Sequence, residues 1–172
     1  MVNSSIALIL MAGWSIVLAP GEGAKVGEAA PKLSVDEWIQ GTPVSDFQKG
    51  TAYVVEFWGT WCSPCLKNIP KLNEVQNQNA SKGLVVIGVA SHEFKGRAEL
   101  GSFMEKRGSE LGYRIAYDGD LSMEHDWDTG GNADVQFRMP LCFVINRQGI
   151  VVFAGHPENE GFDAALTKVL SE

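Results

Sequence analysis

The stretch Thr51-Ala52-Tyr53-Val54-Val55-Glu56-Phe57-Trp58-Gly59-Thr60-Trp61-Cys62-Ser63-Pro64-Cys65 decides how the rest of this 172-residue chain is interpreted. Its first half is an apolar run rich in β-branched and aromatic residues, which predicts a strand covered on both faces. After Ser63 the apolar residues recur at the three-residue spacing of a helix, at Leu66, Ile69, Leu72 and Val75. The two cysteines therefore lie where a buried strand gives way to a helix.

Cys62 and Cys65 have the spacing that thiol–disulfide exchange requires. At the start of a helix, the Cys62 sulfur would lie near unsatisfied backbone N–H groups, which stabilise a thiolate, the nucleophilic form. Cys65 lies one helical turn later and is placed to attack a mixed disulfide formed by Cys62. The alternative is an inert disulfide or half of a zinc site. Structural zinc usually needs four ligands, and the other candidates are scattered along the chain: His92, His125, His156 and Cys142.

Glu56 is the anomaly in the apolar run, because a carboxylate in a central strand loses its water and usually has a raised pKa. The alternative is a carboxylate that pairs with a lysine on an edge strand, since Glu is rarely buried without a partner. Cys142 lies in a second apolar run and is interpreted as a small buried hydrophobe, with a regulatory or resolving thiol as the alternative.

Hydrophobic patterns predict further strands and helices downstream. Strands are expected at 84–90, 114–117, 141–145 and 150–153, and helices at 97–107 and 161–170. Asn146, Arg147, Gln148 and Gly149 separate the last two strands and indicate a hairpin. Such a succession predicts an α/β domain in which helical crossovers join a central sheet. Residues 118–132 are acidic and irregular, with Trp127 as a possible anchor.

The N-terminal third is less regular. Residues 6–18 are nearly all apolar, and we expect 1–24 to be a signal peptide or membrane anchor. Residues 25–31 have the composition of a linker, and 32–172 are expected to form one domain. Near its start, residues 33–39 predict a short peripheral strand or hairpin.

The net charge of −7, without a dense Lys/Arg cluster, argues against nucleic acid and anionic membrane surfaces as partners. With only three cysteines, the chain is not a small scaffold held by several disulfides.

The order of elements resembles the thioredoxin fold, and specific residues carry the likeness. Residues 56–65 are similar to the F-W-x-x-W-C-x-P-C signature of thioredoxins. Pro70 matches the proline that kinks the active-site helix, and Met139-Pro140 matches the cis-proline that faces the dithiol. The G-T-W-C version of the motif and the apparent export segment resemble TlpA/ResA-like proteins, over residues 31–170. Met139 departs from the more usual Thr or Ile at its position.

This resemblance implies a thioredoxin fold, with a central mixed β-sheet flanked by helices and an N-terminal β-hairpin extension. It implies a thiol–disulfide oxidoreductase that reduces protein disulfides, with Cys62 attacking, Cys65 resolving and Glu56 moving protons. Its substrate would be a disulfide-bearing protein, and its reductant a membrane-borne or thioredoxin-type protein. We expect an extracytoplasmic monomer, exported or membrane-tethered, with no cofactor or metal beyond the cysteine pair.

Further residues have expected roles in this interpretation. Trp61 would form an apolar rim beside the dithiol, while Trp58 belongs to the core. The backbone of Met139, before Pro140, would pair with an extended substrate. Ser63 and Pro64 would tune the thiolate, whose pKa should lie below the free value of about 8.5. The reduction potential is expected in the reducing half of the range from about −270 to about −120 mV.

Two other functions remain open. A thioredoxin-like copper or cytochrome-maturation factor would use the same cysteines to hold a metal or an apocytochrome. A peroxiredoxin is disfavoured because Val55 and Gly59 occupy the Pro and Thr/Ser positions of the P-x-x-x-T/S-x-x-C pattern.

Overall fold

The computed structural model describes residues 23–127 and 139–172. The expected signal peptide or anchor, 1–24, lies almost entirely outside the described residues. Among those that are described, no helix combines the length and apolar character needed to cross a membrane.

A single mixed sheet of six strands organises the fold, in the order β1-β4-β3-β2-β5-β6. The strands are β1 (Glu37–Gln40), β2 (Ala52–Trp58), β3 (Leu84–Ala90), β4 (Arg114–Tyr117), β5 (Leu141–Ile145) and β6 (Val151–Gly155). The neighbours β2, β3 and β4 run parallel, whereas β1, β5 and β6 each run antiparallel to their neighbours. The strand that leads to the cysteines, β2, is therefore one of the two central strands, beside β3.

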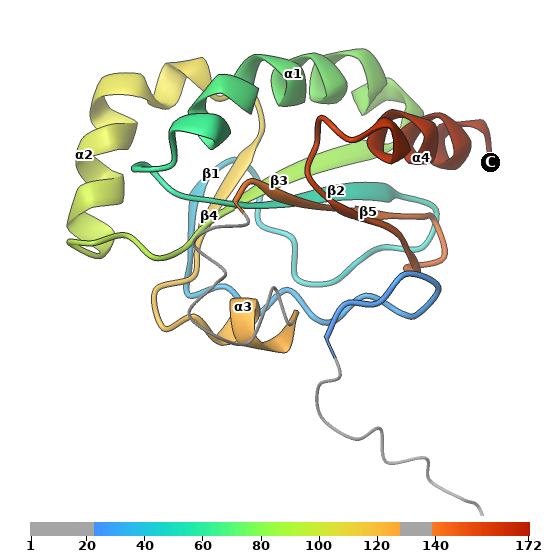
Figure 1. Cartoon of the computed structure of the whole chain (residues 1–172), viewed down its shortest axis with the longest axis horizontal. Coiled ribbons are helices and arrows are strands. Elements are labelled where there is room, and N and C mark those ends of the chain that lie inside the picture. The colour runs from blue at the N-terminus through green and yellow to red at the C-terminus, as the bar shows by residue number, and fades with distance from the viewer. Residues whose placement is uncertain (1–22, 128–138) are drawn as a thin grey trace, which may run out of the picture.

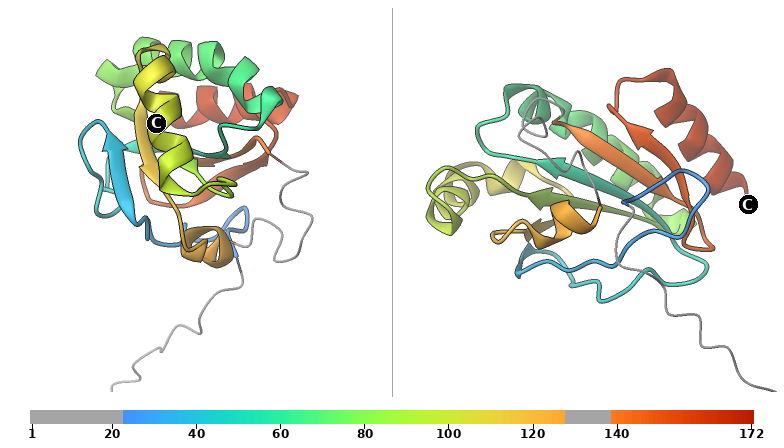
Figure 2. Two further views of the ribbon diagram at one scale, coloured as in Figure 1. Left: turned by 90° about the vertical axis from the view of Figure 1, so that its left-hand side faces the viewer. Right: turned by 60° about the horizontal axis from the view of Figure 1, so that its bottom comes forward.

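Helices cover both faces of this sheet (Figures 1 and 2). The longer helices are α1 (Ser63–Asn79), α2 (Arg97–Arg107) and α4 (Glu160–Ser171), and α3 (Ser122–Asp126) is a single short turn. The views show α1, α2 and α4 on one face and α3 on the other. Because β2, β3 and β4 succeed one another in the same direction across the sheet, right-handed crossovers place α1 and α2 on one side.

The core lies on both sides of β2, which is buried along its whole length. On the α3 side, Trp127 is fully buried and packs edge-on against Phe57 and Phe143, with centroids 5.9 and 5.0 Å away. On the other side, Leu72 of α1 and Phe162 of α4 are fully buried. Trp127 is thus the anchor that the sequence suggested, and the cysteines begin the helix that packs on the most buried strand.

The predicted thioredoxin fold is confirmed, and most predicted elements lie within one or two residues of the observed ones. α1 continues through Pro70 to Asn79. The irregular stretch 118–132 contains α3, whose start is stabilised by Asp118: its carboxylate accepts hydrogen bonds from the backbone N–H groups of Met123 and Glu124. Five residues are too few to show a helical period, and 128–132 lie outside the described residues.

The N-terminal region contains the predicted short peripheral strand but, within the described residues, no hairpin, and residues 27–30 of the predicted linker are hydrogen-bonded to the sheet. Residues 27–30 bond to the turn before β6 and to its start, where Gly27 N–H donates to Val151 O and Ala30 N–H donates to Gly149 O. β1 is one strand that pairs with β4. After β1 the chain turns at Gly41, whose φ is +81°, and residues 43–51 supply no second strand. Instead of pairing with a neighbouring hairpin strand, β1 pairs with the outer edge of β4.

Candidate active site

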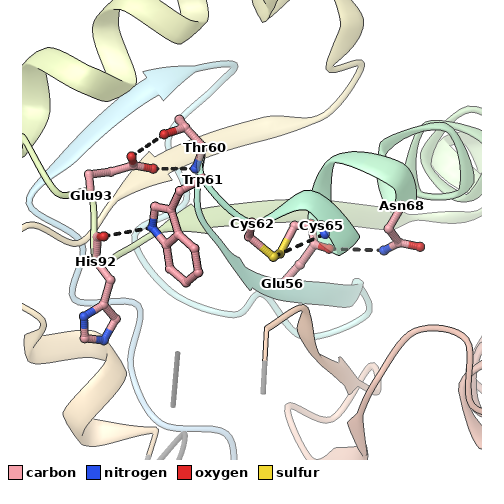
Figure 3. Close-up of a disulfide and its surroundings, with 8 residues drawn as sticks. All are labelled: Glu56, Thr60, Trp61, Cys62, Cys65, Asn68, His92 and Glu93. Atoms are coloured by element: carbon pink, nitrogen blue, oxygen red, sulfur yellow. Dashed lines mark hydrogen bonds between the residues drawn. A yellow bond between two sulfur atoms is a disulfide. The ribbon is translucent and has the colours of Figure 1, made fainter. Parts of the chain in front are cut away.

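Cys62 and Cys65 form a disulfide at the N-terminus of α1 (Figure 3). Cys62 is the N-cap residue, and the backbone N–H of Cys65 donates to its Sγ across 3.2 Å. Both residues are nearly covered, with 3% of Cys62 and 1% of Cys65 exposed. After reduction, the same N–H group and the positive end of the helix stabilise a thiolate on Cys62 rather than on Cys65.

Ser63 and Pro64 lie between the cysteines and are exposed. Pro64 occupies the first turn of α1, where its missing N–H interrupts no intrahelical bond. The tip of the motif is therefore solvent-facing while both sulfurs are screened.

Glu56 is buried beneath the start of α1, with 1% of its surface exposed. Its Oε1 accepts a hydrogen bond from Asn68 Nδ2 at 3.1 Å, and Figure 3 shows its side chain extending from β2 toward α1. Burial raises the pKa of Glu56 to about 8, against the opposing effect of the Asn68 hydrogen bond. The alternative of an edge-strand carboxylate is wrong, because β2 has neighbours on both sides.

Cys142 lies opposite Glu56 in the register of β5 on β2. It is a free thiol and fully buried, as predicted for a small hydrophobe. Burial, with the nearby Glu56 charge as a smaller cause, raises the pKa of Cys142 well above its usual value. This thiol is therefore held in its unreactive protonated form.

Met139 and Pro140 are joined by a cis peptide bond immediately before β5. Both residues are buried. The next residue, Leu141, pairs with Phe57 near the C-terminal end of β2. The Met139-Pro140 peptide therefore lies beside the strand end from which the cysteine motif follows.

Trp61 is fixed beside the disulfide by the loop between β3 and α2, residues 91–96. Its indole Nε1 donates to the backbone oxygen of His92 at 2.8 Å, and its ring lies 5.5 Å from that of Phe94. A Cβ atom on Gly59 would lie 2.6 Å from the Trp61 Nε1, so the indole position requires glycine there. Phe94 is 70% exposed, which makes it an unusual solvent-facing aromatic side chain next to the motif. Trp58, by contrast, is 1% exposed and belongs to the core, as expected.

The structure does not bring the histidines and Cys142 together as a metal site. His92 Nε2 pairs with Glu124 at 2.8 Å, His125 is largely exposed, and His156 lies near Glu158. Within residues 23–127 and 139–172, the one group with metal-ligating atoms in reach of one another is Asp36, Asp118 and Asp120. These carboxylates already accept backbone hydrogen bonds.

Sequence reasoning missed Asn68, Glu93 and Phe94. Asn68 follows Cys65 by three residues and lies on the buried face of α1, so helical spacing could have identified it. No pattern in the sequence indicates that residues 92–94 meet Thr60 and Trp61, because this contact joins two loops more than thirty residues apart.

Comparisons with known proteins agree with this geometry. The Redoxin family model matches residues 25–170. The thiol-disulfide oxidoreductase ResA of Bacillus thuringiensis subsp. konkukian is 34% identical, over 86% of this chain and 80% of the relative. Protein FixW of Rhizobium leguminosarum is 30% identical over 76% of this chain, which spans only 60% of the length of FixW.

A solved structure resembles the fold as a whole. It is a putative thiol:disulfide interchange protein DsbE from Chlorobium tepidum, with a TM-score of 0.65 and 21% identity, covering 86% of this chain and 99% of the other. The resemblance to thioredoxin-like and ResA-like proteins that the motifs suggested is confirmed.

Proposed function

Because this chain belongs to the Redoxin family, we propose that it is a thiol–disulfide oxidoreductase that reduces disulfides in other proteins. The observation that supports this most directly is the Cys62–Cys65 disulfide at the start of α1, with a backbone N–H directed at Cys62 Sγ. The names of the ResA relatives agree with it.

Cys62 is the attacking residue in this proposal. Its thiolate forms a bond to one sulfur of the substrate disulfide, and the other substrate sulfur leaves as a thiolate. Cys65 then attacks Cys62 Sγ, which releases the second substrate sulfur and forms the Cys62–Cys65 disulfide. Two electrons pass from the dithiol to the substrate, and the chain needs no further redox group for this step.

Glu56 is proposed to accept the proton that Cys65 must lose before it attacks. Only the ionised carboxylate is a base, and the Glu56 pKa of about 8 leaves most of it protonated at neutral pH. We therefore expect the resolving step to accelerate as the pH rises through about 8. Glu56→Gln should abolish this acceleration. An unchanged pH profile in that variant would show that Glu56 does not accept the proton from Cys65.

Substrate contacts are proposed for the residues that flank the disulfide. The cis Met139-Pro140 peptide lies next to the end of β2, where the backbone of Met139 is placed to pair with an extended substrate segment. Trp61 supplies an apolar rim whose orientation is fixed by His92. Ser63 and Pro64, exposed between the cysteines, face an approaching substrate.

The proposed setting is extracytoplasmic, with the chain exported or tethered and acting as a monomer. The apolar residues 6–18 support export. A membrane-borne or thioredoxin-type protein would return electrons to the cysteine pair. Cell fractionation tests the location, and a mature protein that begins at Met1 in the cytoplasmic fraction would contradict it.

Insulin reduction tests the activity. With dithiothreitol as electron donor, the protein should accelerate precipitation of the insulin B chain, and Cys62→Ser should abolish this. Cys65→Ser should instead accumulate a mixed disulfide with its substrate. Cys142→Ser is the matched control, since this buried thiol takes no part in the steps above. Undiminished turnover by Cys62→Ser would overturn the proposal.

The competing functions have their own readouts. A peroxiredoxin would consume hydrogen peroxide at the expense of dithiothreitol, and a copper-maturation factor would bind Cu(I) tightly through Cys62 and Cys65. We expect neither result. The reduction potential should lie nearer to −270 mV than to −120 mV, and a value near the upper limit would mark an oxidant instead.

A further inference from the structure

Glu93, in the loop between β3 and α2, holds the segment that precedes Cys62. Its Oε1 accepts a hydrogen bond from the backbone N–H of Thr60 at 2.8 Å, and its Oε2 accepts one from the Thr60 hydroxyl at 2.5 Å. Figure 3 shows the two bonds side by side, on the opposite side of Trp61 from the disulfide. Glu93 is 9% exposed, so these contacts are shielded from bulk water.

The two Thr60 donors stabilise the ionised form of Glu93, but burial has the larger effect, and the net result is a raised pKa. Both carboxylate oxygens accept from Thr60, and an amide N–H has no alternative to donating. Burial raises the pKa of Glu93, the two Thr60 bonds oppose that rise, and the charge of Glu99 adds slightly to it. Tyr117 also lies within electrostatic reach. Within residues 23–127 and 139–172, no lysine, arginine or histidine forms an ion pair with Glu93.

This charge lies near the backbone of the attacking residue. Thr60 precedes Cys62 by two residues, which span at most about 7 Å of backbone, so the Glu93 carboxylate lies within about 10 Å of the Cys62 amide. Exposed charges at that distance are largely screened by salt, but a buried carboxylate is screened much less. A nearby negative charge disfavours a thiolate and leaves a disulfide unaffected. It therefore destabilises the reduced form relative to the oxidised form.

We propose that Glu93 is a positioning residue that fixes the Thr60-Trp61 segment ahead of Cys62 and, through its charge, keeps the Cys62–Cys65 pair reducing. The proposal deepens the proposed function, since it rests on this pair being redox active. It assigns a regulatory effect to a residue outside the cysteine motif, the cis-proline and Glu56. The same carboxylate links the active-site loop to the loop that carries Phe94.

Three variants separate charge from position. Glu93→Gln keeps the shape: its Oε1 can accept from Thr60 N–H and its amide can donate to the Thr60 hydroxyl, so only the charge is lost. Glu105→Gln is the matched control, because it removes the same charge from an exposed position on α2. Glu93→Ala removes the charge and both contacts.

The first measurement is the equilibrium of each variant with glutathione, combined with the pH dependence of Cys62 alkylation. We expect Glu93→Gln to lower the Cys62 pKa and, at a pH above that pKa, to shift the equilibrium constant toward the reduced protein by up to about tenfold, which corresponds to about 30 mV. Glu105→Gln should match the wild type. A Glu93→Gln protein that is folded by circular dichroism and has the wild-type potential would overturn the charge effect.

The second measurement is hydrogen exchange at the Thr60 amide. Glu93→Gln should retain the protection of this amide, and Glu93→Ala should lose it by at least tenfold; unchanged protection in Glu93→Ala would overturn the positioning role. Neither measurement uses a protein substrate. Failure of insulin reduction would therefore count against the proposed function and leave this inference to be decided separately.

Discussion

Asn68 Nδ2 donates a hydrogen bond to Glu56 Oε1 across 3.1 Å, and both residues are buried between α1 and β2. Asn68 lies one helical turn after Cys65, so α1 carries both the resolving cysteine and the partner of the carboxylate proposed to serve it. Because an amide N–H stabilises the ionised carboxylate, this contact moderates a pKa that burial raises.

Replacement of Glu56 by Gln should stabilise the protein at alkaline pH. The pKa of Glu56 is raised from 4.5 to about 8 on folding, so the folded state holds a proton that the unfolded state loses between these values. Stability therefore falls as the pH rises from 4.5 to about 8. At 1.36 kcal/mol per pH unit, the gain in Glu56→Gln should approach roughly 5 kcal/mol at pH 9 and vanish below pH 4.

Urea unfolding of the oxidised protein at pH 4, 6 and 9 measures this gain. The Gln side chain has nearly the same shape as Glu and keeps an oxygen that accepts from Asn68, so the two proteins differ mainly in the titrating group. Equal stabilities of the two proteins at pH 9 would mean that Glu56 is not a buried acid.

Replacement of Asn68 by Ala should raise the pKa of Glu56 further, because the variant removes a donor to its carboxylate. The Glu56 carboxyl resonance, followed by NMR over a pH titration, reports the change. Gln76→Ala is the control, since Gln76 is a buried polar residue of α1 whose bonds go to Leu84 and Val86. If Asn68→Ala and Gln76→Ala leave Glu56 with the same pKa, the contact has no electrostatic effect.

Cys142 should resist alkylation in the folded protein. Its side chain is fully buried and its pKa is raised well above the usual value. The reagent therefore cannot reach the sulfur, and the thiol is not ionised to the reactive thiolate. Iodoacetamide at pH 8 should label Cys62 in the reduced protein within minutes and leave Cys142 unlabelled until denaturant is added. Mass spectrometry of the peptides distinguishes the sites, and labelling of Cys142 at the rate of Cys62 would contradict this.

Replacement of Trp127 by Ala should cost about 3–5 kcal/mol of stability, as for other large buried aromatic side chains. Its ring is fully buried among Phe47, Phe57 and Phe143, and its indole donates to Lys32 O at 3.0 Å. Trp61→Ala is the comparison, because Trp61 is only partly buried and should cost less. Denaturant midpoints give both values, and a larger loss in Trp61→Ala would reverse the assignment of core and rim.

The sequence predicted those parts of the fold that depend on local pattern. The apolar run before the cysteines, the three-residue period after them and the hairpin at Asn146–Gly149 each contain their own signal, and all were found. The cysteine pair, Glu56 and Met139-Pro140 were identified by their place in a recognisable motif. The structure brings all of them to one end of the sheet.

Contacts between distant loops could not be predicted in this way. The bonds of Thr60 to Glu93, and of Trp61 to His92, depend on where the loop after β3 lies relative to the loop after β2, and hydrophobic periodicity contains no information on this. The same limit explains residues 25–31. Their sequence has no hydrophobic period, yet their backbone forms hydrogen bonds beside β6.

The chain before β2 reaches both outer edges of the sheet. This arrangement protects the sheet from edge-to-edge aggregation. An open strand edge offers unpaired N–H and C=O groups to other copies. At one end β1 is only four residues long and has an irregular register between Trp38 and Gln40, features that blunt an edge. At the other end, residues 27–30 cover the start of β6. Removal of residues 23–40 would therefore leave the cysteine site intact in sequence but expose two new strand edges to self-association.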